Sequence, residues 1–378
     1  MDERVTINKN DRLAAATRHL EREAFDGLIA ASNGLNNFLD ANAVYVLSGV
    51  RPIGESAVVL DRDGRSTLIV TPAWDEERAA SVSATDQTIG SDDLAASLQK
   101  VADKHRLDLT RTLSVGLTLL GQGLFDRIAS SLGTLPKAAD ELTRDLACVR
   151  NADELAAAQR ATAIAERGYE RLLECARPGM REFELAAELY CFMKRLGAED
   201  NFLLMSASQH NHAVRAAGER ILDVGDIILS EITPCYRGQF VQICRTTVIG
   251  EPRPMVREKY AILQDAMREG LTAARAGTTV ADVTLVINSV IQKAGYGEYC
   301  RPPYMRVRGH GLGITSDRPG DIVDTNRRVL ESGMVFVMHP NQYIPESGYL
   351  MCGETVVVSD EGARSLSARQ AELDVIAV

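Results

Sequence analysis

Apolar and polar residues alternate differently on the two sides of residue 147. The first part carries a helical pattern near residues 10–24, further helical patterns near 92–106 and 123–132, and apolar runs at 25–32, 43–49, 56–64, 66–72 and 113–118. Two of these runs are joined by Asp61-Arg62-Asp63-Gly64, a turn sequence typical of a β-hairpin. The mixture predicts an α/β domain over residues 1–147.

The second part begins with a long amphipathic helical pattern over residues 151–176. Asn151 suits the N-cap of this helix, and Glu154 is placed to complete a capping box. A second helix is predicted at 181–197, and another pair follows at 257–277 and 279–295. Each pair precedes strand-like segments, so residues 148–378 are predicted to form an α+β domain with an internal duplication.

Composition narrows the class of protein. A chain of 378 residues with 45% hydrophobic and 25% charged residues is typical of a globular, multidomain protein. A net charge of −10 argues against nucleic acid or an anionic membrane as the main partner. The seven cysteines show no paired spacing, and the N-terminus lacks an apolar signal region. We therefore expect a cytoplasmic protein with reduced thiols.

Candidate chemistry is concentrated in four segments of the second domain, at residues 226–250, 306–314, 333–343 and 348–362. Glycines on both sides of His310 allow the backbone to pass close to a ligand. His339 ends an apolar strand, where the chain leaves the sheet before a proline. Glu231 lies in an apolar run, where an unpaired carboxylate is costly, so it should have a partner.

These four segments resemble the superfamily of methionine aminopeptidase, prolidase and creatinase, whose catalytic domain has the pita-bread fold. The resemblance implies an α/β N-terminal domain (1–147) followed by an α+β pita-bread catalytic domain (148–378) with internal pseudo-two-fold duplication. Metal-dependent members bind two divalent ions through two Asp, one His and two Glu. The corresponding positions here are Glu231, Gln242, His310, His339 and Gly353. Because three of the five ligands are replaced, we expect no metal and no other cofactor.

Creatinase and ectoine hydrolase are metal-independent precedents within this superfamily. Their proton-carrying histidine lies in the loop that corresponds to residues 206–226, where His212 is the nearest match and His210 the alternative. Imidazole suits this role because its pKa lies near neutral pH. The resemblance predicts four catalytic residues, His212, Glu231, His310 and His339. It predicts substrate contacts from Arg51, Gln242, Tyr304, Arg308 and Glu354.

The predicted function is a metal-independent, creatinase-like hydrolase or lyase. It would cleave a C–N bond in a small polar, carboxylate-bearing molecule by His/Glu acid–base chemistry. His310 and His339 would polarise the reacting centre or stabilise negative charge. Two alternatives stay open: a catalytically inactive pita-bread protein that acts as a binding module or scaffold, and a peptidase with one residual metal held by Glu231, His310 and His339.

The N-terminal domain is predicted to serve the partner subunit. Relatives place this domain over the neighbouring catalytic domain, and Arg51 could bind a substrate carboxylate there through bidentate hydrogen bonds. A homodimer with composite active sites is therefore expected. His19 and His105 are predicted on surface helices, away from any chemistry.

Overall fold

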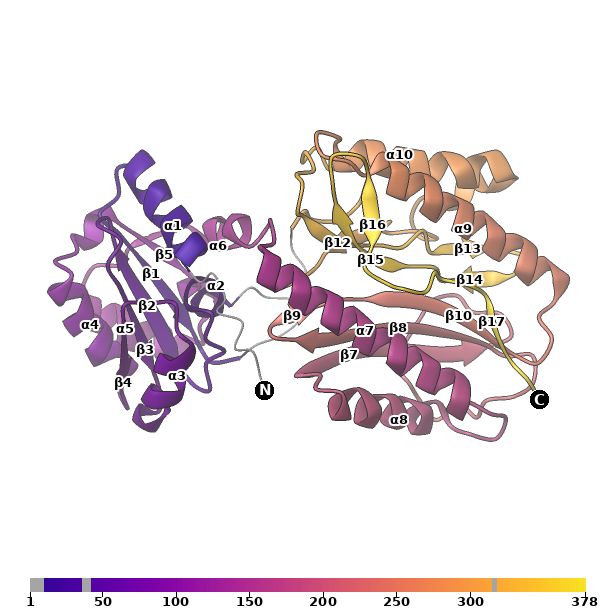
Figure 1. The fold of residues 1–378 in the computed structure, drawn as a ribbon, viewed down its shortest axis with the longest axis horizontal. Coiled ribbons are helices and arrows are strands. Elements are labelled where there is room, and N and C mark those ends of the chain that lie inside the picture. The colour runs from indigo at the N-terminus through magenta and orange to yellow at the C-terminus, as the bar shows by residue number, and fades with distance from the viewer. Residues whose placement is uncertain (1–9, 36–41, 315–317) are drawn as a thin grey trace. The chain divides into compact units, whose positions relative to one another are not determined.

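The computed structural model describes residues 10–35, 42–314 and 318–378. The chain divides into two compact units, Met1–Ala147 and Cys148–Val378, and Figure 1 traces both. The first unit is α/β, and the second combines long helices with mostly antiparallel sheets. The predicted fold class, an α/β domain followed by a duplicated pita-bread domain, is confirmed.

A six-stranded sheet with helices on both faces forms the N-terminal unit, in the strand order β4-β3-β2-β1-β5-β6. Its strands are β1 (Gly27–Ser32), β2 (Ser56–Asp61), β3 (Ser66–Val70), β4 (Gln87–Gly90), β5 (Thr112–Val115) and β6 (Lys137–Ala138). Its helices are α1 (Asn10–Arg22), α2 (Ala43–Ser48), α3 (Glu76–Val82), α4 (Leu94–Lys104), α5 (Gln122–Leu132) and α6 (Asp140–Leu146). Strands β2 and β3 pair antiparallel, as the predicted hairpin requires.

Two features of this unit differ from the sequence-based expectation. The apolar run at 43–49 is the short helix α2, because the side chain of Asn42 caps its first turn and Gly49 ends it in a left-handed conformation. His105 is buried, not on a surface. Its ring contacts the carboxylate of Asp61 at 3.0 Å and the hydroxyl of Thr67 at 2.9 Å.

The second unit contains four main helices, eleven strands and short helical turns within the described residues. The helices are α7 (Ala152–Cys175), α8 (Glu182–Arg195), α9 (Pro254–Ala273) and α10 (Val280–Ile291). The first strands are β7 (Asp200–Ser208), β8 (Ile227–Tyr236), β9 (Gln239–Phe240), β10 (Ile243–Ile249) and β11 (Gly309–Gly311). The later ones are β12 (Val335–Met338), β13 (Gln342–Ile344), β14 (Gly348–Leu350), β15 (Glu354–Val358), β16 (Ala363–Ser365) and β17 (Asp374–Ile376).

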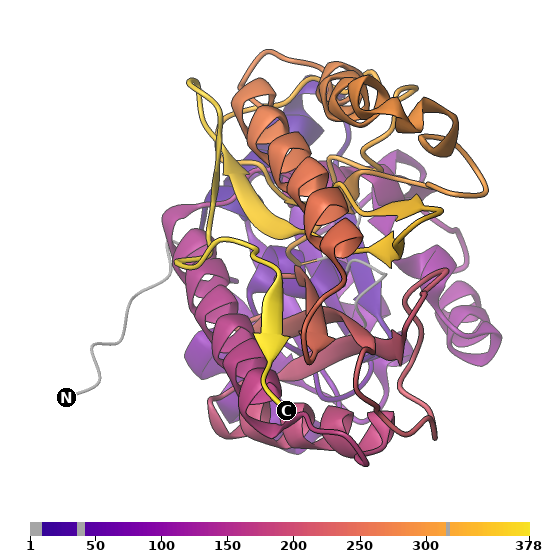
Figure 2. The same cartoon turned by 90° about the vertical axis from the view of Figure 1, so that its right-hand side faces the viewer.

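Each half of this unit packs a helix pair against its own strands. Helices α7 and α8 share a buried core with Ile228, Ile232 and Ile243 of β8 and β10. Helices α9 and α10 share another with Phe336 and Met338 of β12. Figures 1 and 2 show the two helix pairs against separate sets of strands. Because side chains alternate along a strand, the odd-numbered positions of β12 face away from α9 and α10. Those of β8 face away from α7 and α8, and Ile227 and Leu229 belong to the core of α9 and α10.

The start of α7 follows the sequence directly. Asn151 accepts a hydrogen bond from the backbone N–H of Glu154 at 2.9 Å, and the Glu154 carboxylate accepts one from the N–H of Asn151 at 3.1 Å. The predicted capping box is confirmed. Among the described residues, no helix has both the length and the apolar character needed to span a membrane.

Candidate active site

The register of the antiparallel strands brings the candidate residues into one row. Glu231 of β8 lies opposite Cys244 of β10, and Cys244 forms a bridge with Gly353. Strand β12 pairs with β15 so that His339 follows in the same row, opposite Gly353. Residues directly opposite each other in a ladder share one face of the sheet. Four positions far apart in the sequence therefore line one stretch of a common sheet face.

Glu231 is the carboxylate of this row, and it remains partly exposed. Burial raises its pKa to about 7, because the surrounding sheet removes the water that would stabilise the charged form. The shift gives Glu231 the pKa of a group that exchanges protons near neutral pH. Its neighbour across the ladder is Cys244, whose thiol is neutral.

His310 is held in a defined tautomer by its own loop. Its Nδ1 lies 3.0 Å from the carbonyl oxygen of Gly311. A carbonyl only accepts hydrogen bonds, so Nδ1 carries the proton and Nε2 presents a lone pair. Burial lowers the pKa of His310, which keeps this ring neutral near pH 7. A neutral ring with its proton on Nδ1 has the chemistry of a proton acceptor at Nε2.

His339 lies deeper than His310, and their ring centroids are 5.6 Å apart in an edge-to-face arrangement. Burial, followed by the proximity of His310, lowers the pKa of His339 to about 3. Its Nδ1 is buried without a hydrogen-bond partner in the structure. A neutral, buried imidazole with an unsatisfied nitrogen is suited to contact a polar group of a ligand.

Gln242 and Cys244 form the neutral part of the site. The amide nitrogen of the Gln242 side chain lies 3.4 Å from the Cys244 sulfur, and both residues are buried. Burial raises the pKa of the Cys244 thiol well above its ordinary value, and nearby Glu231 adds to this effect. The thiol therefore stays protonated, which disfavours a nucleophilic role.

His212 is placed in an aromatic cluster. Its ring is nearly parallel to that of Tyr343, with centroids 5.6 Å apart, and His210 packs edge-on 5.3 Å away. Tyr304, which is 41% exposed, lies nearly parallel to Tyr343 at 5.7 Å. Tyr299 packs edge-on against Tyr304, with centroids 4.9 Å apart. We name the rings of His210, His212, Tyr299, Tyr304 and Tyr343 the aromatic cluster.

The aromatic cluster adjoins the row of Glu231 through a hairpin that the sequence reading did not single out. Tyr343 of β13 lies directly opposite Tyr349 of β14. Burial raises the pKa of Tyr349, and the proximity of Glu231 raises it further, which places these two side chains close together. The two tyrosines are visible in the sequence, but only the hairpin register shows that they lie opposite each other.

Two predicted substrate contacts prove to be structural. Arg308 is fully buried, and its guanidinium donates to Asn288, Asn341 and Gln342 at 2.8–2.9 Å. Glu354 is also buried, 2.9 Å from the guanidinium of Arg245 and hydrogen-bonded to Ser367. Both side chains are occupied by the protein. Adjacent positions on a strand face opposite sides, so Glu354 does not take the place of a carboxylate at Gly353.

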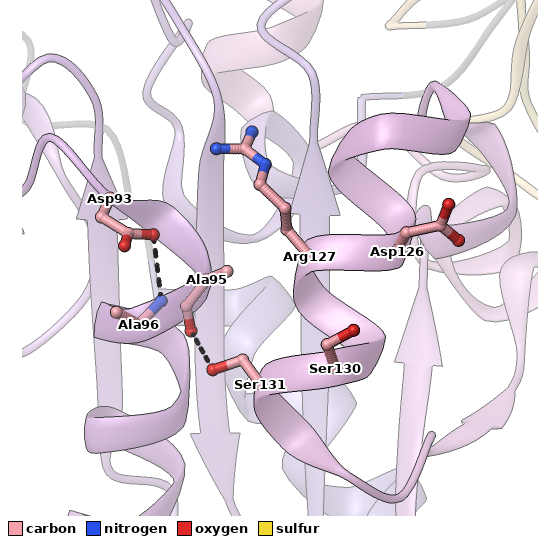
Figure 3. Close-up of a pocket in the computed structure, with 7 residues that line it drawn as sticks. All are labelled: Asp93, Ala95, Ala96, Asp126, Arg127, Ser130 and Ser131. Carbon is pink, nitrogen blue, oxygen red and sulfur yellow. Dashed lines mark hydrogen bonds between the residues drawn. The ribbon is translucent and has the colours of Figure 1, made fainter.

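Arg51 lies in the N-terminal unit and is half-buried. Its backbone carbonyl accepts a hydrogen bond from Arg78 at 3.2 Å. The described part of that unit also contains a surface hollow of about 410 Å³ beside α4 and α5, shown in Figure 3. Arg127 on its wall is paired with Glu55 at 2.8 Å, and Asp93 caps α4. Arg127 and Asp93 are therefore engaged in structural contacts.

The residues of the row do not fit the dinuclear metal centre that the superfamily implies. Two adjacent divalent ions need several anionic oxygen ligands, some of them bridging. Here Gln242 is neutral, His339 is a buried imidazole, and Gly353 has no side chain. Within residues 10–35, 42–314 and 318–378, no three His, Cys, Asp or Glu side chains converge in a way that could hold a metal ion.

Comparison with known proteins places this fold and site in a family. Residues 156–360 match metallopeptidase family M24, more than half of the chain, and the chain belongs to that family. It is therefore related to hydrolases. A Xaa-Pro dipeptidase of Pyrococcus furiosus is 28% identical over 334 residues, which cover 87% of this chain and 92% of the relative. The probable dipeptidase PepE of Mycobacterium tuberculosis is 31% identical over 254 residues, covering 66% and 67%.

Solved structures agree on the architecture. The prolidase from Pyrococcus horikoshii superimposes with a TM-score of 0.82 over 96% of this chain and all of that chain, at 22% identity. The dipeptidase PepE from Mycobacterium ulcerans gives a TM-score of 0.80 at 27% identity over 99% of both chains.

The relatives contradict the function predicted from the sequence. We expected a metal-independent, creatinase-like enzyme for a non-peptide substrate, but the similar proteins are named as dipeptidases and prolidases, and their family as metallopeptidases. Family membership thus favours peptide C–N bonds. The prediction was wrong because it inferred the substrate class from the replacement of metal ligands. Over most of its length, the chain is similar to a Xaa-Pro dipeptidase.

Proposed function

We propose that this chain hydrolyses a small peptide of the dipeptide class. The support for the substrate class is its similarity to a Xaa-Pro dipeptidase over 87% of its length. The support for catalysis is the row that carries Glu231 and His339, with the ring of His310 beside that of His339, their centroids 5.6 Å apart. Burial raises the pKa of the Glu231 carboxyl to about 7 and lowers the pKa of the His310 imidazole. A protonated acid and a neutral base can then coexist at neutral pH.

Each group has a distinct role in this proposal. The Nε2 lone pair of His310 takes a proton from water as the water oxygen attacks the peptide carbonyl carbon. The carboxyl group of Glu231 gives its proton to the departing nitrogen as the C–N bond breaks. The proton on His310 then returns to the Glu231 carboxylate through solvent, which restores both groups. His339 would contact the substrate through its unpartnered Nδ1.

The remaining predicted residues take binding roles in this proposal. His212 lies against Tyr343 in the aromatic cluster, so it would contact the substrate side chain rather than carry the proton. Tyr304 would extend the same wall. Gln242 would hold a polar substrate group within the row, and Arg51 would bind the substrate carboxylate if subunits combine as predicted.

The test is a dipeptide screen on the purified chain, with product amino acids detected by mass spectrometry. We expect release of both amino acids from at least one Xaa-Pro or related dipeptide, with and without added Mn²⁺ or Co²⁺ as separate arms. The Glu361→Gln variant, altered at an exposed loop carboxylate, serves as the control and should retain activity. Absence of cleavage of every dipeptide by folded protein would reject the proposal.

A second candidate function is peptide binding without cleavage. Gln242 and Gly353 favour it, because neither can serve as an anionic ligand or a base. The same screen separates the two functions. Dipeptides that raise the melting temperature but are recovered intact support binding, whereas dipeptides that are consumed support catalysis.

A further inference from the structure

The replacements at the former ligand positions are connected in space. Gly353 lies between Cys244 and His339, its neighbours on the two adjoining strands. Its backbone N–H donates to the Cys244 carbonyl at 3.1 Å, and the Cys244 N–H donates to its carbonyl at 3.0 Å. These two reciprocal bonds fix how closely the strands approach at this point. The spacing on either side of Gly353 is therefore set by the backbone.

The side chains of both neighbours occupy the space beside Gly353. A Cβ atom at this position would lie 2.7 Å from the Cβ of His339, 2.8 Å from the Cβ of Cys244 and 2.8 Å from its sulfur. Two of these atoms are attached directly to the backbone, so rotation about a side-chain bond cannot move them away. Adding even one carbon to Gly353 forces a shift of the paired strands.

We infer that Cys244, Gly353 and His339 are one interlocked packing unit that fills the place of a bridging carboxylate, so this site does not bind a pair of divalent ions. The unit also fixes the position of the His339 side chain, because the Cβ of His339 lies directly beside Gly353. The inference concerns the residues of the chain and does not depend on the proposed peptide substrate.

The chemistry of the row agrees with the packing. A bridging ligand must offer two anionic oxygens, and position 353 offers none. Cys244 is a protonated, buried thiol, and Gln242 beside it is a neutral amide. Glu231 is then the carboxylate that remains among the five former ligand positions. One carboxylate does not offset the charge of two adjacent dications.

Metal uptake tests the inference directly. Tag-free protein is dialysed against Mn²⁺, Co²⁺ or Zn²⁺ in separate experiments, and bound metal is counted by elemental analysis beside the Glu231→Gln variant. We expect fewer than two ions per chain with each metal. Two ions per wild-type chain, with uptake lost in Glu231→Gln, would overturn the inference.

The packing unit is tested without metal by the Gly353→Ala variant. We expect a fall in the melting temperature of roughly 2–10 °C, from the usual cost of overpacking a core. The NMR signals of the His339 ring should shift while those of His19 stay in place. The Gly218→Ala variant is the control, because a Cβ there meets one neighbour at an ordinary 3.5 Å. A Gly353→Ala variant with unchanged melting temperature and unchanged His339 signals would contradict the interlocked unit.

Discussion

At the scale of single residues, the sequence predicts Glu231, His310 and His339 as site residues. Glycines flank His310, His339 ends an apolar strand, and Glu231 is a carboxylate within an apolar run. It does not show which groups are satisfied by the protein. Arg308 is in the right segment, but its guanidinium is saturated by Asn288, Asn341 and Gln342. His105 follows a predicted surface helix, yet Asp61 and Thr67 bury it. Such partners lie far away in sequence and emerge only from the fold.

The raised pKa of Glu231 predicts a pH-dependent gain in stability on substitution. The carboxyl ionises near pH 4.5 when unfolded and near 7 in the folded protein. The folded state therefore binds this proton more tightly than the unfolded state does. The resulting contribution to the free energy of unfolding is lost as the pH rises from about 4.5 to 7. Glu231→Gln should be more stable than wild type by about 3 kcal/mol at pH 8, and by much less at pH 4.5. Urea unfolding at both pH values measures this difference.

The exposed carboxyl of Glu361 provides the comparison for that experiment. Its conversion to Gln should change stability little, and equally, at both pH values, because an exposed loop carboxyl ionises almost alike in both states. A Glu231→Gln variant whose stability difference from wild type is the same at pH 4.5 and 8 would show that burial does not perturb this carboxyl.

At the scale of elements, the periodic helices and the β2–β3 hairpin follow from local pattern, and the capping box of α7 is seen in both sequence and structure. The strand register is a different matter. The row Glu231–Cys244–Gly353–His339 joins β8, β10, β15 and β12, and no local signal specifies which residue faces which across a long connection. The coupling of two replaced ligand positions, Gly353 and His339, through Cys244 could therefore not be predicted from the sequence.

The junction between β10 and β15 depends on the buried pair Arg245 and Glu354. The two groups are 2.9 Å apart, and Arg245 also donates to the Gly353 carbonyl at 2.8 Å. Glu354→Gln should destabilise the catalytic unit by about 3–5 kcal/mol, because it leaves a buried guanidinium without its counter-charge. Chemical denaturation measures the loss.

The double variant Arg245→Met/Glu354→Leu is the matched control for this pair. Removing both charges should cost much less than removing one, since buried ion pairs are often replaceable by apolar side chains. Equal losses in the single and double variants would mean that packing, and not the unpaired charge, dominates at this junction.

At the scale of the whole molecule, two compact units and membership of family M24 agree with the reading of the chain as an N-terminal α/β domain and a pita-bread domain. The predicted non-peptide substrate was wrong, because the replacement of metal ligands bears on metal binding and does not specify the substrate. The use of the N-terminal unit remains a prediction. The predicted role of Arg51 depends on how two subunits associate, which the sequence of one chain does not specify.

The homodimer prediction is tested by sedimentation at micromolar concentration. We expect a species of twice the chain mass of 41.2 kDa. If Arg51 completes the partner's site, Arg51→Ala should raise KM for a dipeptide, because the charge-assisted bonds to its carboxylate are lost, while kcat changes less. A monomer at this concentration, or an Arg51→Ala variant with unchanged KM, would count against composite sites.

Turnover by a Glu231 variant tests most directly whether this residue is the proton donor of a peptide-cleaving site. The rate constant kcat for a cleaved dipeptide is determined at pH 7 for wild type and for Glu231→Gln. We predict a fall of roughly 10²–10⁴, the usual contribution of a positioned proton-transfer group. Circular dichroism should show the variant folded. A Glu231→Gln enzyme that cleaves the same dipeptide at the wild-type rate would contradict the account.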